Sequence, residues 1–99
     1  MNIQDEYELV MQLYQYSTLL NKQIDSLNLS NKIKQGIKYS LSIGKRIPNA
    51  ILLHPIKQTE FIKNLSEFKD FSFRFSLYVQ PNHCIIYDSG YLDSVVVNL

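Results

Sequence analysis

Four side chains carry functional groups that a catalytic or metal site could use: His54, His83, Cys84 and Asp88. A cysteine nucleophile needs a thiolate stabilised by a nearby cation and a base within hydrogen-bond reach. Adjacent residues of a strand point to opposite faces, so His83 is badly placed to activate Cys84. His54 meets the requirement only if its strand neighbours that of Cys84. A single free cysteine more often behaves as a small buried apolar residue, and we favour that interpretation.

Metal, carboxylate and phosphate chemistry have less support. The two histidines and one cysteine show no local spacing typical of metal ligands. Glu60 and Glu67 lie seven residues apart on the outer face of a predicted helix, without a partner that would raise a carboxyl pKa. Gly36, Gly44 and Gly90 are isolated, so no glycine-rich phosphate loop exists. The sequence therefore predicts no catalytic residue, metal ligand or cofactor, and a protein that is not an enzyme.

The composition is that of an ordinary globular chain. It has 99 residues, 45% hydrophobic and 19% charged, which predicts a single α+β domain over residues 1–99. The net charge of +1 provides no strong field toward nucleic acid or a membrane surface. Its apolar runs are too short to span a bilayer, and no signal peptide is expected. One cysteine suits a reducing compartment.

A strand–helix–strand unit between Ile47 and Val79 is predicted to organise the chain. Residues 50–53 read as a strand, and Pro55 suits the first turn of a helix over residues 56–68. Residues 71–79 then alternate as an extended strand. Its apolar face comprises Phe71, Phe73, Phe75, Leu77 and Val79. The polar opposite face predicts a sheet covered on one side only, or on both if a partner subunit supplies the second layer.

Residues 4 to about 27 are predicted to form the longest helix. Its apolar side is wider than packing on one core requires. Two interpretations remain open at this point. The helix is either buried between the sheet and a second helix, or it reserves an extra face for another chain.

A second helix is predicted to begin at a cap, Asn28 or Ser30, and to run to about Ile43. Gly44 would follow as the residue past its end, and Gly36 would permit a close approach. This segment is basic and holds no acid. The residues available to contact phosphates are Lys34, Lys38, Lys45 and Arg46. Solvated lysines that complement the negative end of the helix are the alternative explanation.

The last part of the chain reads as two strands, residues 83–87 and 91–97, joined by a reversal at Asp88-Ser89-Gly90 where Gly90 is suited to positive φ. The predicted fold is α+β: two N-terminal helices, then β-α-β-β-β, with the helices on one face of a mostly antiparallel sheet. One parallel pair is expected across the 56–68 helix. The valine-rich last strand must be internal to the sheet or be paired by another chain.

Seven tyrosines provide large contact areas with polar tips, which suit surfaces that meet partners. Half-buried packing at the margin of the core is the alternative. We predict a protein-contact surface on the first helix and on the polar face and edge of the sheet, formed by Tyr7, Met11, Tyr14, Tyr16, Arg74, Tyr78, Tyr91 and Val95.

The segment from Ile47 to Pro55, a short helix, an extended strand and Pro81-Asn82-His83 before a final hairpin together resemble small phage-encoded virion or accessory proteins. The extended strand departs from that pattern in lacking a glycine. The resemblance implies assembly or host-factor binding. We therefore predict a non-enzymatic interaction protein of phage or mobile-element origin. It would be located in the host cytoplasm or the virion, as a homo-oligomer or bound to a larger protein, without membrane association. A small nucleic-acid-associated protein that uses the basic segment is the second hypothesis.

Overall fold

A computed structural model describes residues 3–20 and 28–99 of the chain. The described helices and strands are, in order, α1 (Ile3–Gln15), β1 (Ser17–Leu20), α2 (Leu29–Ser42), β2 (Ala50–Leu53), the 3-10 turn η1 (Pro55–Lys57), α3 (Gln58–Ile62), the 3-10 turn η2 (Leu65–Phe68), β3 (Ser72–Phe75), β4 (His83–Asp88) and β5 (Asp93–Asn98).

The five strands form one mixed sheet in the order β1-β5-β4-β2-β3. The β5–β4 and β4–β2 pairs are antiparallel, whereas β1–β5 and β2–β3 are parallel. The α+β class and the parallel pair across the 56–68 region are confirmed. The prediction of a mostly antiparallel sheet is wrong, because β1 adds a second parallel pair. The valine strand β5 is internal, so this edge needs no other chain.

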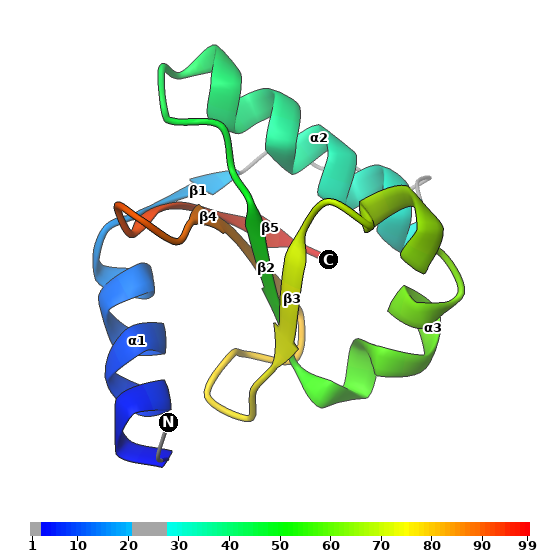
Figure 1. Ribbon diagram of the computed structural model, residues 1–99, viewed down its shortest axis with the longest axis horizontal. Helices are drawn as coiled ribbons and strands as arrows, with labels where there is room; N and C mark the ends of the chain where they lie inside the picture. Colours follow the sequence, from blue (N-terminus) through cyan, green and yellow to red (C-terminus); the bar gives the residue numbers. More distant parts are fainter. Residues whose placement is uncertain (1–2, 21–27) are drawn as a thin grey trace.

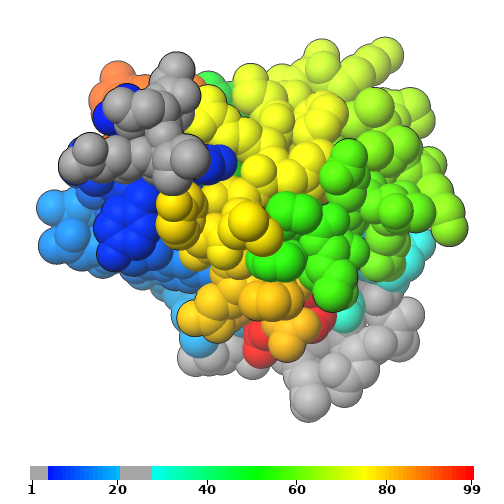
Figure 2. Space-filling view, turned by 90° about the horizontal axis from the view of Figure 1, so that it is seen from below, coloured from blue at the N-terminus to red at the C-terminus, as the bar shows by residue number. Residues whose placement is uncertain are grey.

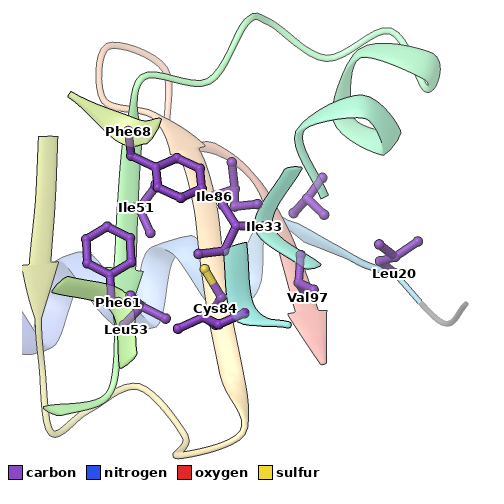
Figure 3. Packing of buried hydrophobic residues seen from close by; sticks show 11 residues of the cluster. Leu20, Ile33, Ile51, Leu53, Phe61, Phe68, Cys84, Ile86 and Val97 are labelled. Carbon is purple, nitrogen blue, oxygen red and sulfur yellow. The ribbon is translucent and has the colours of Figure 1, made fainter. Parts of the chain in front are cut away.

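Helices cover both faces of the sheet, in contrast to the one-faced arrangement that the sequence predicted (Figure 1). The α1 helix packs on one face, where Val10 and Leu13 join Leu52, Ile85 and Val96 in a buried cluster. The α2 and α3 helices lie on the other face. Figure 3 shows that second cluster, whose labelled members include Ile33, Phe61, Phe68, Cys84 and Val97. No partner subunit is needed to supply the second layer.

The first helix is much shorter than predicted. It ends at Gln15, and Ser17–Leu20 form β1 instead of a continued helix. The Ser17 hydroxyl donates to the Tyr14 carbonyl at 2.8 Å, and the strand pairs in parallel with residues 94–97. Pairing with β5 therefore overrides a helical hydrophobic period, because tertiary contacts decide weak local preferences. The part of the predicted helix over residues 21–27 lies outside the described residues.

The second helix agrees with its prediction. Asn28 is the N-cap, and its side-chain oxygen accepts from the Asn31 N–H at 2.9 Å. Gly44 follows the helix with φ of 81°. Gly36 is buried where a Cβ would overlap the side chains of Val97 and Ile86, so it does permit a close approach of α2 to the sheet.

The central strand–helix–strand unit is present only in part. The prediction of one helix over residues 56–68 is wrong, because the structure has the 3-10 turn η1, the five-residue α3 and the 3-10 turn η2 there. The second strand is also shorter than predicted. Pro55 opens η1, and the crossover through α3 and η2 returns the chain parallel to β2. The β3 strand ends at Phe75 and not at Val79. The Ser76 hydroxyl accepts from the Tyr78 N–H at 3.1 Å, and the Val79 N–H donates to the Ser76 carbonyl at 3.3 Å. This turn breaks the predicted alternation: Val79 is buried, but Leu77 is 77% exposed.

The β4–β5 hairpin differs from its prediction in detail. Gly90 does not take positive φ; Leu92 does, at 54°. The Asp88 carboxylate accepts from the Gly90 N–H at 2.9 Å, and the Asp88 carbonyl accepts from the Tyr91 and Leu92 N–H groups. The reversal is therefore longer than the tight turn expected, and its left-handed residue falls at the last loop position.

Candidate functional site

The four side chains with catalytic groups do not assemble into a site. Cys84 is fully buried, and burial raises the pKa of its thiol well above the ordinary value, so the predicted apolar role is confirmed. Its strand does pair with β2, which ends one residue before His54, with Leu53 opposite Cys84. However, the Nδ1 atom of His54 accepts from the Ile56 N–H at 3.1 Å and caps η1. Within residues 3–20 and 28–99, no three His, Cys, Asp or Glu side chains gather as metal ligands.

His83 instead belongs to a small polar network. Its Nδ1 atom lies 3.0 Å from the Tyr14 hydroxyl, which also accepts from the Gln80 N–H at 3.0 Å. Since that hydroxyl has a single proton, the simplest assignment has Tyr14 donating to a neutral His83 ring. Burial lowers the pKa of His83 and raises that of Tyr14, which favours the neutral form of both groups. The network ties the loop before β4 to α1.

The basic residues of the second hypothesis do not form one open patch. Lys34 forms an ion pair with Glu67, whose other carboxylate oxygen accepts from the Ser30 hydroxyl. Lys45 binds Asp93 at 2.6 Å. The Arg46 guanidinium lies 3.4 Å above the centre of the Tyr91 ring. Lys38 is exposed on α2.

The predicted contact residues divide into several groups. Tyr7 and Tyr78 meet edge to face, with ring centres 5.2 Å apart. Arg74 is exposed on β3. Val95 is fully buried between the helical layers, so its placement on a contact surface is wrong. The sequence leaves open whether the valine strand is internal to the sheet or paired by another chain, and its pairing with β1 and β4 makes it internal.

The remaining predicted residues lie apart from that tyrosine pair. Met11 is partly exposed on α1, and Tyr16 is well exposed just after that helix. Tyr91 is exposed in the β4–β5 turn beneath Arg46. The Tyr14 ring is half-buried and its hydroxyl is engaged in the His83 network.

A groove of about 400 Å³ opens where β2 and β3 end, beside the Tyr7–Tyr78 pair. Its walls come from three parts of the chain: α1, the start of η1, and the end of β3 with the turn that follows. The lining residues are Glu6, Pro55, Phe75, Ser76, Leu77 and Tyr78. Figure 2 looks at this end of the molecule, where the yellow and gold segment lies between blue α1 and the green segment that follows β2. The volume is within the range typical of ligand pockets, about 300–1,000 Å³.

Hydrogen bonds hold in place the groove wall at Ser76–Tyr78 and the loop that continues from it to His83. The Ser76 hydroxyl fixes Tyr78, and the Tyr14 hydroxyl fixes Gln80. The His83 N–H then donates to the Gln80 carbonyl at 2.9 Å. Val79 is buried against the cluster under α1. A wall bonded at successive positions is preformed and loses little freedom when a ligand enters.

Sequence reasoning missed most of the groove. Of its lining residues, the predicted contact surface included Tyr78 alone. The sequence predicts Leu77 on the apolar face of a long strand and gives no indication that Glu6 lies at a groove. The Ser76 side chain, which can bond backbone two residues further on, was the signal for a turn at this point.

No described helix has the length and apolar character needed to cross a membrane. The sequence matches no protein-family model, no curated protein and no solved structure. The resemblance to phage accessory proteins therefore stays a prediction.

Proposed function

We propose that this chain is a non-enzymatic protein-interaction module that holds an apolar side chain of a partner protein in the groove beside Tyr7 and Tyr78. The observation that carries the proposal is the groove itself, with Leu77 left 77% exposed at its wall by a turn whose Ser76 N–H donates to the Leu53 carbonyl of β2. Large exposed apolar side chains around a preformed concavity are typical of partner-binding sites.

The chemistry of the lining specifies what the groove would bind. Pro55, Phe75 and Leu77 offer apolar contact, and the Tyr78 ring adds an aromatic surface. Glu6 is the charged group of the lining. A bulky aliphatic or aromatic side chain that is followed or preceded by Lys or Arg would fill the groove and reach the Glu6 carboxylate. The partner is therefore a protein segment of that composition.

The other hypotheses receive less support from the same geometry. A cysteine enzyme would need an accessible thiolate, whereas Cys84 is buried and its pKa is raised. A phosphate-binding surface would need open cations, whereas Lys34, Lys45 and Arg46 already contact Glu67, Asp93 and Tyr91. We extend the proposal to a host or virion protein as the partner, inside the host cell or the virion, on the basis of the sequence resemblance.

Selection from a displayed library of short random peptides tests the proposed function. We expect the protein to enrich peptides that place a bulky apolar residue next to Lys or Arg. Leu77→Ser should abolish this enrichment. Glu6→Gln should keep the apolar preference and lose the preference for the basic neighbour, because only the charge of the lining has changed.

Ile47→Ser is the matched control. The side chain of Ile47 is 75% exposed, a fraction similar to that of Leu77. Ile47 precedes β2, however, so it lies at the opposite end of the β2–β3 pair from the groove. This variant should select the same peptides as the unaltered protein. Peptides that bind Leu77→Ser as well as the unaltered protein, or a selection that enriches no common pattern, would refute the proposal.

A further inference from the structure

One lateral edge of the sheet is open at β3. This strand is the last in the order β1-β5-β4-β2-β3 and pairs with β2 on one side. The Ser72 N–H donates to the Asn49 carbonyl at 3.0 Å, and the Ser76 N–H donates to the Leu53 carbonyl at 2.9 Å. Since the direction of backbone groups alternates along a strand, those of Phe73 and Phe75 point away from β2. Among the described strands, none pairs with that side.

The edge lacks most of the features that normally prevent pairing between chains. Natural edge strands are protected by short length, charged side chains, proline, bulges or a covering segment, and β3 has the first of these, with four residues. The strand Ser72–Phe75 contains no proline, and Arg74 is its sole charge. The Phe73 side chain remains 39% exposed.

An aromatic cluster extends from the core to this edge. It contains all five phenylalanines of the chain, Phe61, Phe68, Phe71, Phe73 and Phe75. The Phe61 ring is buried, stacks on Phe68 at 5.6 Å and contacts Phe73 at 5.1 Å. The cluster is therefore buried on the core side, whereas its ring at the edge, Phe73, is partly exposed.

We propose that a second copy of this chain pairs antiparallel with β3 through a two-fold axis at Phe73, which joins the two sheets into one. Closed two-fold dimers are the commonest symmetric assembly, and each copy then presents the same strand to the other. The proposal concerns the strand edge and does not rest on the proposed function, although Phe75 at the end of β3 also lines the groove.

The backbone limits which registers are possible. The outward groups belong to Phe73 and Phe75, so a hydrogen-bonded pair must bring odd-numbered residues together. An axis at Arg74 would place two arginines directly opposite each other, which is unfavourable. An axis at Phe73 instead places Phe73 opposite its copy and Arg74 opposite Ser72. Phe71, whose N–H already donates to the Phe68 carbonyl at 2.9 Å, then lies beside Phe75 of the copy. Aromatic cross-strand pairs are among the favourable ones, and these pairs would complete the aromatic cluster.

The occupant is a second copy and not an unrelated strand because the edge is complementary to itself. In this register, Ser72 of each copy pairs with Arg74 of the other, so a small side chain lies opposite a large one. Phe73 pairs with Phe73 of the copy, so two aromatic rings lie opposite each other. Phe73 supplies the exposed ring on both sides of the axis.

Light scattering over a concentration series, combined with cysteine cross-linking, tests the proposal. The unaltered protein should change from monomer to dimer as its concentration rises. Phe73→Asp places like charges opposite each other at the axis, so it should raise the dimer dissociation constant by roughly a hundredfold. Leu19→Asp is the matched control, since Leu19 is similarly exposed on β1, the opposite edge strand. It should leave dimerisation unchanged.

Cross-linking decides the register and does not depend on a disruptive substitution. Under mild oxidation, Phe73→Cys should form a disulfide-linked dimer, because directly opposite residues have Cα atoms about 5.5 Å apart. Arg74→Cys should not form one. The native Cys84 is buried, so the unaltered protein should not cross-link and serves as the negative control. A protein that stays monomeric at all concentrations, or cross-linking of Arg74→Cys in place of Phe73→Cys, would overturn the proposal.

Discussion

The β5 and β3 strands belong to one sheet but have opposite surroundings. In β5, Val95, Val96 and Val97 are buried, because β1 and β4 pair with both sides and helices cover both faces. The β3 strand pairs on one side only, and its Phe73 side chain remains partly exposed. The difference shows that lateral pairing, more than the hydrophobicity of a strand, determines where a small domain has surface to offer another chain.

The largest expected effect comes from placing a charge inside β5. Val95→Asp would bury a carboxylate without a partner, and such uncompensated buried charges cost about 3–5 kcal/mol. We expect the urea midpoint to fall to near zero or the cooperative transition to disappear. Phe73→Asp, at the open edge, is the comparison. If Val95→Asp unfolded at the same urea concentration as Phe73→Asp, β5 would not be enclosed.

A smaller effect is expected where α2 packs on β5. The Cβ of Gly36→Ala would overlap Val97 and Ile86, and overpacking of this kind typically costs about 1–3 kcal/mol. Gly90→Ala is the control, because its Cβ would make only an ordinary contact 3.5 Å from the Asp88 carboxylate. Urea unfolding of both variants measures the difference. Equal stability of the two variants would contradict the close approach of α2.

The loop that follows β3 depends on the Tyr14 hydroxyl. Tyr14→Phe removes the group that bonds both His83 and the Gln80 N–H, so we expect a loss of about 1–2 kcal/mol in the free energy of unfolding. Binding at the groove should weaken as well, because the loop that continues from the wall at Tyr78 is no longer held at Gln80. Tyr16→Phe is the matched control, since Tyr16 is well exposed. An unchanged free energy of unfolding in Tyr14→Phe would exclude the network.

The same network predicts how stability depends on pH. Burial lowers the pKa of His83 in the folded protein below its ordinary value of 6.5. At pH values between these two pKa values, the unfolded chain therefore binds more protons than the folded protein. The free energy of unfolding therefore rises with pH through this window, and its His83 contribution is lost as the pH falls below about 6.5. Urea unfolding across this range, with His83→Gln as the control that removes the contribution, measures the slope. An identical slope in both proteins would contradict the assignment.

The smallest effect on stability is expected at Leu77. Leu77→Ser changes an exposed side chain, and such surface changes usually alter the free energy of unfolding by less than about 0.5 kcal/mol. Loss of peptide binding in this variant would then reflect the groove and not the fold. Thermal unfolding checks the point. A marked fall in its midpoint would show that Leu77 supports the core.

The sequence predicted those elements whose signals are local. Asn28 as a cap and Gly44 after the helix act on the backbone beside them, whereas Pro55, predicted to open a helix over residues 56–68, opens only a 3-10 turn. What it did not predict depends on distant partners. Residues 17–20 form a strand because they pair in parallel with residues 94–97, and that pairing also makes β5 internal. The groove was missed because it forms only when α1, the end of β2 and the turn after β3 meet.

Amide hydrogen exchange at Phe73 and Phe75, followed from low to high protein concentration, tests the central contrast most directly. We expect the amides of Val95, Val96 and Val97 to be protected at every concentration. Those of Phe73 and Phe75 should exchange quickly in dilute solution and become protected as the dimer forms. Protection at Phe73 that is already complete in dilute monomer, or that never appears, would contradict the assignment of β3 as the edge that another copy completes.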